Sequence, residues 1–171
     1  MNPTDSDPGG AQGRLSHLEG EGRTTRSRMV DVAAKPVSVR TALARSVVRF
    51  PRGVLAGILR DGGPKGPIEE VARTAAILAA KRTGDLIPMC HPLALDHVQV
   101  DFSAEGDRLE ILASAKTSGR TGVEMEAMCA AAVAALTVYD MTKAVSKGIR
   151  IEAVELREKT GGKSGPWTAP D

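Results

Sequence analysis

The chain has very few aromatic side chains. Of its 171 residues only 2% are Phe, Trp or Tyr, although 42% are hydrophobic. A hydrophobic fraction of this size supports the core of a single domain, and that core must consist mainly of Ala, Val, Leu, Ile and Met. No block of Lys and Arg is interleaved with aromatic residues. The sequence therefore lacks the stacking platforms with which proteins bind single-stranded nucleic acid.

Charge of one sign, cysteines and long apolar runs are also scarce. The net charge of +2 is too small to indicate nucleic-acid binding, but it leaves open a basic pocket for a phosphorylated small molecule. The two cysteines, Cys90 and Cys129, form no CxxC pair, so we expect free thiols. The sequence shows no signal peptide and no apolar run that would span a membrane. These absences predict a cytoplasmic protein with neither a membrane nor a nucleic-acid partner.

The composition divides the chain into a tail, a domain and a second tail. Residues 1–28 contain four acidic residues and four arginines, are rich in Gly and Ser, and include almost no large apolar residue. This composition is typical of a disordered tail. We expect one folded domain over residues 29–165 and a short polar tail over residues 166–171.

The pattern of apolar residues predicts an α+β domain. Expected strands and helices follow in the order β-β-α-α-β-β-α-β, over residues 29–35, 37–50, 51–62, 67–82, 97–102, 108–111, 122–147 and 149–159. This order favours a ferredoxin-like sandwich, in which helices cover one face of a largely antiparallel sheet. The helix over 122–147 is apolar nearly all the way round. One sheet cannot cover every side of it, so we expect an oligomer in which it also packs on another subunit.

This long helix carries charged residues near both ends. Asp140 and Lys143 are three positions apart and share a face. They form either an ordinary surface ion pair or, if buried, a pair with shifted proton affinities that positions a lysine for proton transfer. Glu126 faces the same way as Asp140 but lies about 21 Å from it along the helix. Either an extended ligand runs along the helix, or the ends of helices from different subunits meet in one pocket.

The segment around Cys90 and His91 is a second candidate. Pro88 and Pro92 bracket Met89, Cys90 and His91, so these three residues are expected to be extended. Adjacent residues in an extended segment point to opposite sides, which argues against a thiol–imidazole catalytic pair. The other cysteine and histidines show no ligand spacing, so we expect no metal. Hydrogen bonding or acid–base work by His91, with Cys90 lining a pocket, is the favoured interpretation.

Two lysines lie in glycine-rich loops. Lys65 lies in DGGPKGP, which two prolines stiffen, although exposure to solvent is the common state of such a lysine. Lys163 lies in GGKSG, which is not a P-loop because Arg157 stands where the first glycine would be required. The segment is either a flexible basic tail or a loop whose backbone amides hold a phosphate together with Lys163 and Lys159.

Four segments in order, MVDVAAK, AAKRTGDLIPMCHPL, KTSGRTGVEMEAMCAAAVAALTVYDMTKA and KTGGKSG, resemble the molybdenum cofactor biosynthesis protein C family, the cyclic pyranopterin monophosphate synthases. The resemblance covers Met29 to about Gly165. It implies a ferredoxin-like subunit in a homohexamer, a trimer of dimers, with active sites between subunits. It also implies conversion of 3′,8-cyclo-7,8-dihydroguanosine triphosphate, supplied by a radical enzyme, into cyclic pyranopterin monophosphate and pyrophosphate. No metal or redox cofactor is expected for this step.

The resemblance also implies site residues. The implied catalytic residues are Asp140, Lys143 and Lys65, with the two lysines as acid and base and Asp140 orienting Lys143. The implied substrate-binding residues are Met89, Cys90, His91, Met125, Glu126, Lys163 and Arg40. Of these, His91 and Glu126 would hold the base and ribose, and Lys163 and Arg40 the triphosphate. The roles of Lys81, Lys147 and Lys159 stay open.

Two other classes of function compete with this interpretation. A protein that binds a nucleotide or pterin without changing bonds would use the same basic pocket, and would show tight binding without release of pyrophosphate. A purely structural oligomer built on the Ala-rich helix would leave Lys65, His91 and Lys163 scattered over its surface.

Overall fold

The computed structural model describes residues 18–19 and 26–170, and the chain forms two compact units, residues 1–31 and 32–171. In the first unit, two-residue strands β1 (Leu18–Glu19) and β2 (Arg26–Ser27) pair antiparallel. Most of the expected disordered tail, residues 1–28, lies outside the described residues.

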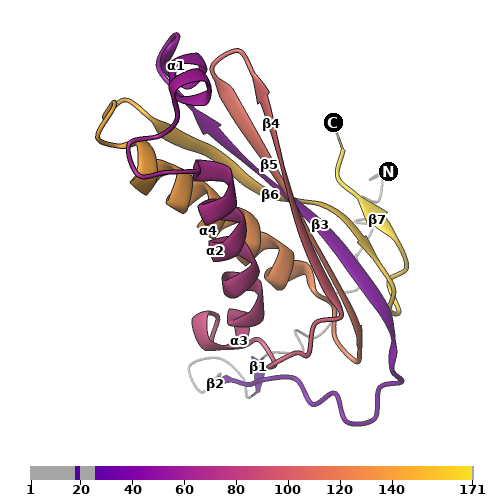
Figure 1. Cartoon of the computed structure of the whole chain (residues 1–171). Helices are drawn as coiled ribbons and strands as arrows, with labels where there is room; N and C mark the ends of the chain where they lie inside the picture. The colour runs from indigo at the N-terminus through magenta and orange to yellow at the C-terminus, as the bar shows by residue number, and fades with distance from the viewer. Residues whose placement is uncertain (1–17, 20–25, 171) are drawn as a thin grey trace, which may run out of the picture. The chain divides into compact units, whose positions relative to one another are not determined.

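The second unit consists of one antiparallel sheet and helices packed on it (Figure 1). Its elements, in chain order, are β3 (Ser38–Arg49), α1 (Val54–Asp61), α2 (Ile68–Lys81), α3 (Thr83–Leu86), β4 (His97–Glu105), β5 (Arg108–Gly119), α4 (Glu124–Thr142), β6 (Arg150–Thr160) and β7 (Trp167–Thr168). The order across the sheet is β4-β5-β3-β6-β7, and all neighbours are antiparallel. Helices α2 and α4 lie side by side on one face of the sheet (Figure 1). The predicted α+β class is confirmed.

Alternation along the central strands explains why one face of the sheet is apolar. Cross-strand pairs on the helix-facing side are Ala42–Ala115, Ala44–Ala113, Ser46–Ile111 and Val48–Leu109, all buried. The facing residues of α4 are also small, and Ala130, Ala131, Ala134 and Ala135 are completely buried. The buried Ser46 hydroxyl donates to the Ala131 carbonyl over 2.8 Å. Small side chains on both surfaces therefore let α4 lie close to the sheet, as the composition predicts.

Four local predictions are wrong. Residues 29–35 form no strand: the Lys35 amide donates to the Val32 carbonyl over 3.0 Å, which closes a turn. Pro36, which follows, has no N–H for a ladder. Met89 is not extended either, because the Cys90 amide donates to the Ile87 carbonyl over 3.0 Å and closes a turn over residues 87–90.

The third difference concerns the long helix. It begins at Glu124 and ends at Thr142, not at residues 122 and 147. Near the C-terminus, Trp167–Thr168 pair with Lys159 and Glu158 of β6, so part of the segment expected to be a polar tail is a strand. Among the described helices, none combines the length and apolar character needed to cross a bilayer.

Candidate functional site

Lys65, Asp140 and Lys143 form one ion cluster. The Asp140 carboxylate accepts from Lys65 Nζ at 2.8 Å through Oδ2, and Lys143 Nζ lies 2.6 Å from Oδ1. Asp140 lies in the last turn of α4, Lys143 caps that helix, and Lys65 reaches across from the turn that precedes α2. All three side chains are about half exposed, at 48%, 53% and 52% for Lys65, Asp140 and Lys143. A ligand therefore has access to both lysines at once.

The cluster fixes the protonation of Asp140 and Lys143. Hydrogen bonds from Lys143 and then Lys65 lower the pKa of Asp140 to about 2. The same carboxylate raises the pKa of Lys143, first through the hydrogen bond and then through its charge. Asp140 is therefore a carboxylate and Lys143 an ammonium group at neutral pH. One carboxylate with two lysine partners leaves a positive surplus that suits a phosphorylated ligand.

A second group of predicted residues gathers at the opposite end of α4. Glu126 is only 3% exposed, and burial raises the pKa of its carboxyl. Burial, then the nearby Glu126 carboxylate, raises the pKa of the Cys90 thiol. A thiol with a raised pKa is a poor nucleophile at neutral pH, so this geometry favours Cys90 as lining. His91 and Met125 are half buried in the same two segments.

Arg40 lies against the glycine-rich turn that follows β6. A Cβ at Gly162 would collide with the Arg40 guanidinium, so only glycine lets the arginine lie flat on this turn. Arg40 Nη2 donates to the Arg120 carbonyl over 3.5 Å. Its Nε, and the hydroxyl of Thr121, are buried atoms with no hydrogen-bond partner among the described residues. Buried donors in native proteins are nearly always satisfied, so these two require an acceptor that the described residues do not supply, either a water or a ligand oxygen.

Lys159 lies beside the same glycine-rich turn. Its ammonium donates to Ser164 Oγ over 2.8 Å and lies 3.6 Å from Glu124 Oε1. Lys163 is exposed on the intervening turn. The sequence interpretation left Lys159 open and missed Thr121 and Ser164, which only the path of the chain brings together. We call this group of Arg40, Lys159 and Lys163, with the unsatisfied donors of Arg40 and Thr121, the basic corner.

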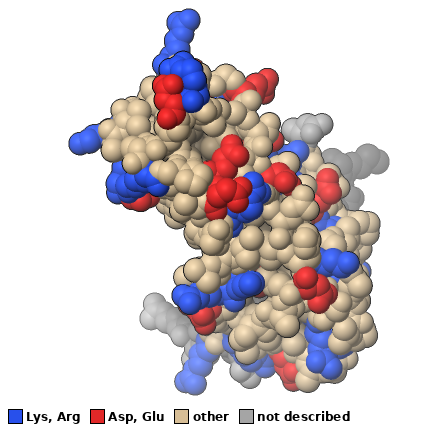
Figure 2. Space-filling view, viewed as in Figure 1, with Lys and Arg blue, Asp and Glu red and all other residues tan. Residues whose placement is uncertain are grey.

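The predicted residues thus lie near the two ends of α4: the ion cluster at one end, and at the other the Glu126 group together with the basic corner, which Lys159 joins to Glu124 over 3.6 Å. Glu126 and Asp140 are separated by about 21 Å along α4, so the ion cluster and the basic corner cannot grip the same small group in one copy. Basic and acidic side chains are interspersed on the face that Figure 2 shows, with no single broad basic surface. Within the ranges that the structure describes, no three His, Cys, Asp or Glu side chains gather as a metal site requires.

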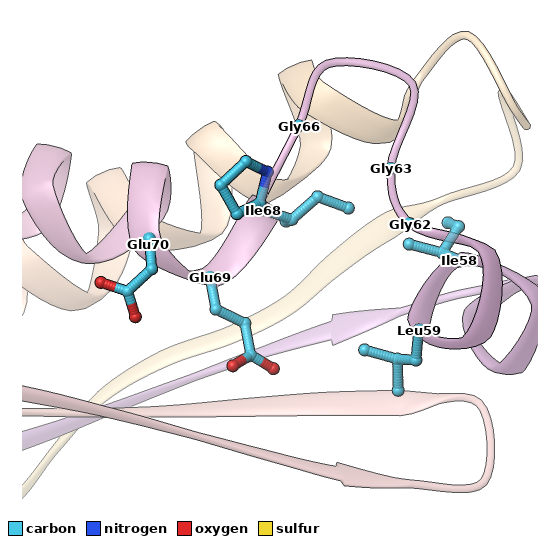
Figure 3. Close-up of a pocket in the computed structure, with 9 residues that line it drawn as sticks. Ile58, Leu59, Gly62, Gly63, Gly66, Ile68, Glu69 and Glu70 are labelled. Atoms are coloured by element: carbon cyan, nitrogen blue, oxygen red, sulfur yellow. The ribbon is translucent and has the colours of Figure 1, made fainter.

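A cavity of about 400 Å³ lies elsewhere, between α1 and the start of α2 (Figure 3). Its lining is Ile58, Leu59, Gly62, Gly63, Gly66, Pro67, Ile68, Glu69 and Glu70. The apolar wall and the two carboxylates would disfavour a triphosphate. None of the predicted site residues lines this cavity, although it adjoins the turn that carries Lys65.

Comparisons with known proteins agree over nearly the whole chain. The MoaC family model matches residues 29–162. A cyclic pyranopterin monophosphate synthase of Novosphingobium aromaticivorans is 52% identical over 157 residues, which is 92% of this chain and 98% of the relative. The enzyme of the same name from Streptomyces avermitilis is 52% identical over 158 residues, 92% of this chain and 91% of the relative. The residues that the family model matches include Lys65, Asp140, Lys143, Glu126 and Arg40, whereas Lys163 follows the last matched residue.

Proposed function

The chain belongs to the MoaC family, and we propose that it is a cyclic pyranopterin monophosphate synthase of molybdenum cofactor biosynthesis. The main support is that the chain is 52% identical, over 92% of its length, to two enzymes of that name. The ion cluster of Lys65, Asp140 and Lys143 supports a catalytic role. The substrate would be 3′,8-cyclo-7,8-dihydroguanosine 5′-triphosphate from a radical enzyme, and the reaction that of a phosphorus–oxygen lyase in the cytoplasm.

The reaction at phosphorus requires proton transfer, which we assign to the ion cluster. A sugar hydroxyl attacks the innermost phosphorus, so that a new P–O bond forms, the bond to pyrophosphate breaks and the hydroxyl loses its proton. Because Asp140 raises the pKa of Lys143, Lys143 starts as an ammonium group and acts as the acid of the pair. Lys65 would then be the base, a role that it can fill only after it has released its own proton. Asp140, ionised because its pKa is about 2, holds Lys143 in place.

The basic corner supplies binding and charge compensation. Arg40 and Lys163 would bind the triphosphate, and Lys159 lies close enough to the same turn to join them. Cations that face the departing pyrophosphate stabilise the charge that develops on it. Glu126 and His91 would hold the base and ribose, with Cys90, Met89 and Met125 as lining. The unsatisfied Nε of Arg40 supports this assignment.

A complete site requires more than one copy. Because the two groups are about 21 Å apart on α4, we propose that the Asp140 end of one subunit meets the Arg40 end of another in a homohexamer, a trimer of dimers. Large apolar side chains are exposed on both helices that cover the sheet, Val71 and Leu78 of α2 and Leu136 of α4, which supports packing on a neighbouring copy. The order β4-β5-β3-β6, with α2 and α4 as crossovers, supports a ferredoxin-like subunit.

Pyrophosphate release tests the function. The purified protein is incubated with the cyclic triphosphate, and with GTP as the negative control. We expect pyrophosphate from the cyclic substrate only, and a loss of about 10²–10⁴-fold in kcat for folded, hexameric Lys143→Ala. Arg60→Ala is the matched control, because Arg60 is an exposed cation that pairs with Asp61. Tight binding without pyrophosphate would refute the proposal and favour a nucleotide- or pterin-binding protein.

A further inference from the structure

Lys65 occupies a tight turn of four residues, Gly63 to Gly66, directly before α2. The Gly66 amide donates to the Gly63 carbonyl over 3.2 Å, and the two glycines form an isolated antiparallel bridge. Gly66 has φ +98°, a conformation that residues with a Cβ rarely adopt. Pro67 follows and precedes the first residue of α2. The lysine therefore extends from a closed turn of fixed direction.

The turn packs on Ile68 and borders a cavity. A Cβ at Gly63 would lie 2.5 Å from Ile68 Cδ1, so the turn rests directly on Ile68, which packs against the hydrophobic core. On the other side lies the cavity of about 400 Å³ that separates the turn from α1 (Figure 3). The backbone conformation of the turn, and of its junction with α2, therefore contributes to where Lys65 points.

We propose that Gly66 is a positioning residue for Lys65. Its positive φ sets the direction in which the chain leaves the turn toward Pro67 and α2, and so places the turn from which the Lys65 ammonium reaches to 2.8 Å from the Asp140 carboxylate. A side chain at Gly66 meets no atom within 4 Å, so substitution acts through backbone conformation and not through a clash. The catalytic part of this inference rests on the proposed function, whereas the placement of Lys65 on Asp140 does not.

The first test is a double-mutant cycle in which kcat is measured. Gly66→Ala forces a Cβ into the left-handed region, and we expect kcat to fall by up to about 10²-fold, the cost of a misplaced catalytic group. Gly66→Asn should restore part of this loss, because Asn tolerates positive φ better than Ala. Gly57→Ala is the matched control: Gly57 lies in α1, has ordinary φ and also has nothing within 4 Å of an added Cβ. We expect it to keep wild-type kcat.

The cycle distinguishes positioning from a general structural effect. If Gly66 acts through Lys65, adding Gly66→Ala to Lys65→Ala costs nothing further in kcat. The proposal is overturned if Gly66→Ala lowers kcat by the same factor in the Lys65→Ala background as in the wild type. It is also overturned if Gly66→Ala keeps wild-type kcat.

The second test needs no turnover. The Asp140 carboxyl is titrated by ¹³C NMR in the full-length protein, with its resonance assigned by its loss in Asp140→Asn. In Gly66→Ala the midpoint should rise toward that of Lys65→Ala, and in Gly57→Ala it should stay at the wild-type value. An unchanged midpoint in Gly66→Ala overturns the proposal. If the wild type releases no pyrophosphate but the midpoint shifts, the proposed function fails and the positioning role stands.

Discussion

The contact between Ser46 and α4 allows a quantitative prediction about the frame that holds the site. Ser46 is fully buried on β3, and its hydroxyl donates to the equally buried Ala131 carbonyl at 2.8 Å. Ser46→Ala removes one hydrogen bond, which lowers the free energy of unfolding by about 1 kcal/mol. Ser46→Leu also overpacks an interface built from small residues, so we expect a loss of about 2–4 kcal/mol.

These energies translate into measurable shifts. For a domain of this size the Tm should fall by about 2–4 °C for Ser46→Ala and about 4–16 °C for Ser46→Leu, measured by circular dichroism at fixed protein concentration. Ser46→Leu should also lower kcat, because it displaces the helix that carries Asp140. Ser103→Leu, at an exposed position of β4, is the control and should leave the Tm nearly unchanged. A Ser46→Leu protein as stable as the wild type would refute the close packing described for α4.

Three further predictions follow from the charges. The Asp140 ion pairs contribute stability that is present above the ordinary pKa of 3.8 and is lost as the pH falls toward about 2. The free energy of urea unfolding should therefore depend less on pH over this range in Asp140→Asn than in the wild type. An unchanged dependence would contradict the pairing. Burial raises the pKa of the Glu126 carboxyl, so the contribution of Glu126 to stability falls as the pH rises. Glu126→Gln should therefore raise the Tm at neutral pH, and a lower Tm at that pH would refute this reasoning. Arg40→Ala should raise KM for the triphosphate more than it lowers kcat, and should weaken the salt dependence of KM; a loss confined to kcat would exclude a binding role.

The sequence predicted local features of the site better than its assembly. The spacing of Asp140 and Lys143 places both on one helix face, and the structure shows their ion pair. Lys65 is 75 positions from Asp140, and no periodicity links the two. The two prolines around Lys65 drew attention to it, but only the resemblance to a family linked it with Asp140, and its catalytic role stays a prediction.

The errors in the predicted structure also arise from contacts that the sequence pattern does not show. Residues 29–35 are rich in β-branched and apolar side chains, but strand formation depends on a neighbouring strand to pair with, and in this segment the Lys35 amide instead closes a turn on the Val32 carbonyl. The unsatisfied Thr121 hydroxyl could not be predicted, because its isolation depends on how the chain folds around it. The small-residue core was predictable because composition alone restricts what can fill it.

A complementation experiment tests the central claim, that cations from two copies of this chain share one substrate, most directly. Lys143→Ala and Arg40→Ala chains are co-expressed, and pyrophosphate release is measured at low concentrations of the cyclic triphosphate. If each site joins Lys143 of one copy to Arg40 of another, random mixing leaves about a quarter of the sites intact, and activity should return to about that fraction of wild type. A mixture no more active than either variant alone would contradict the account.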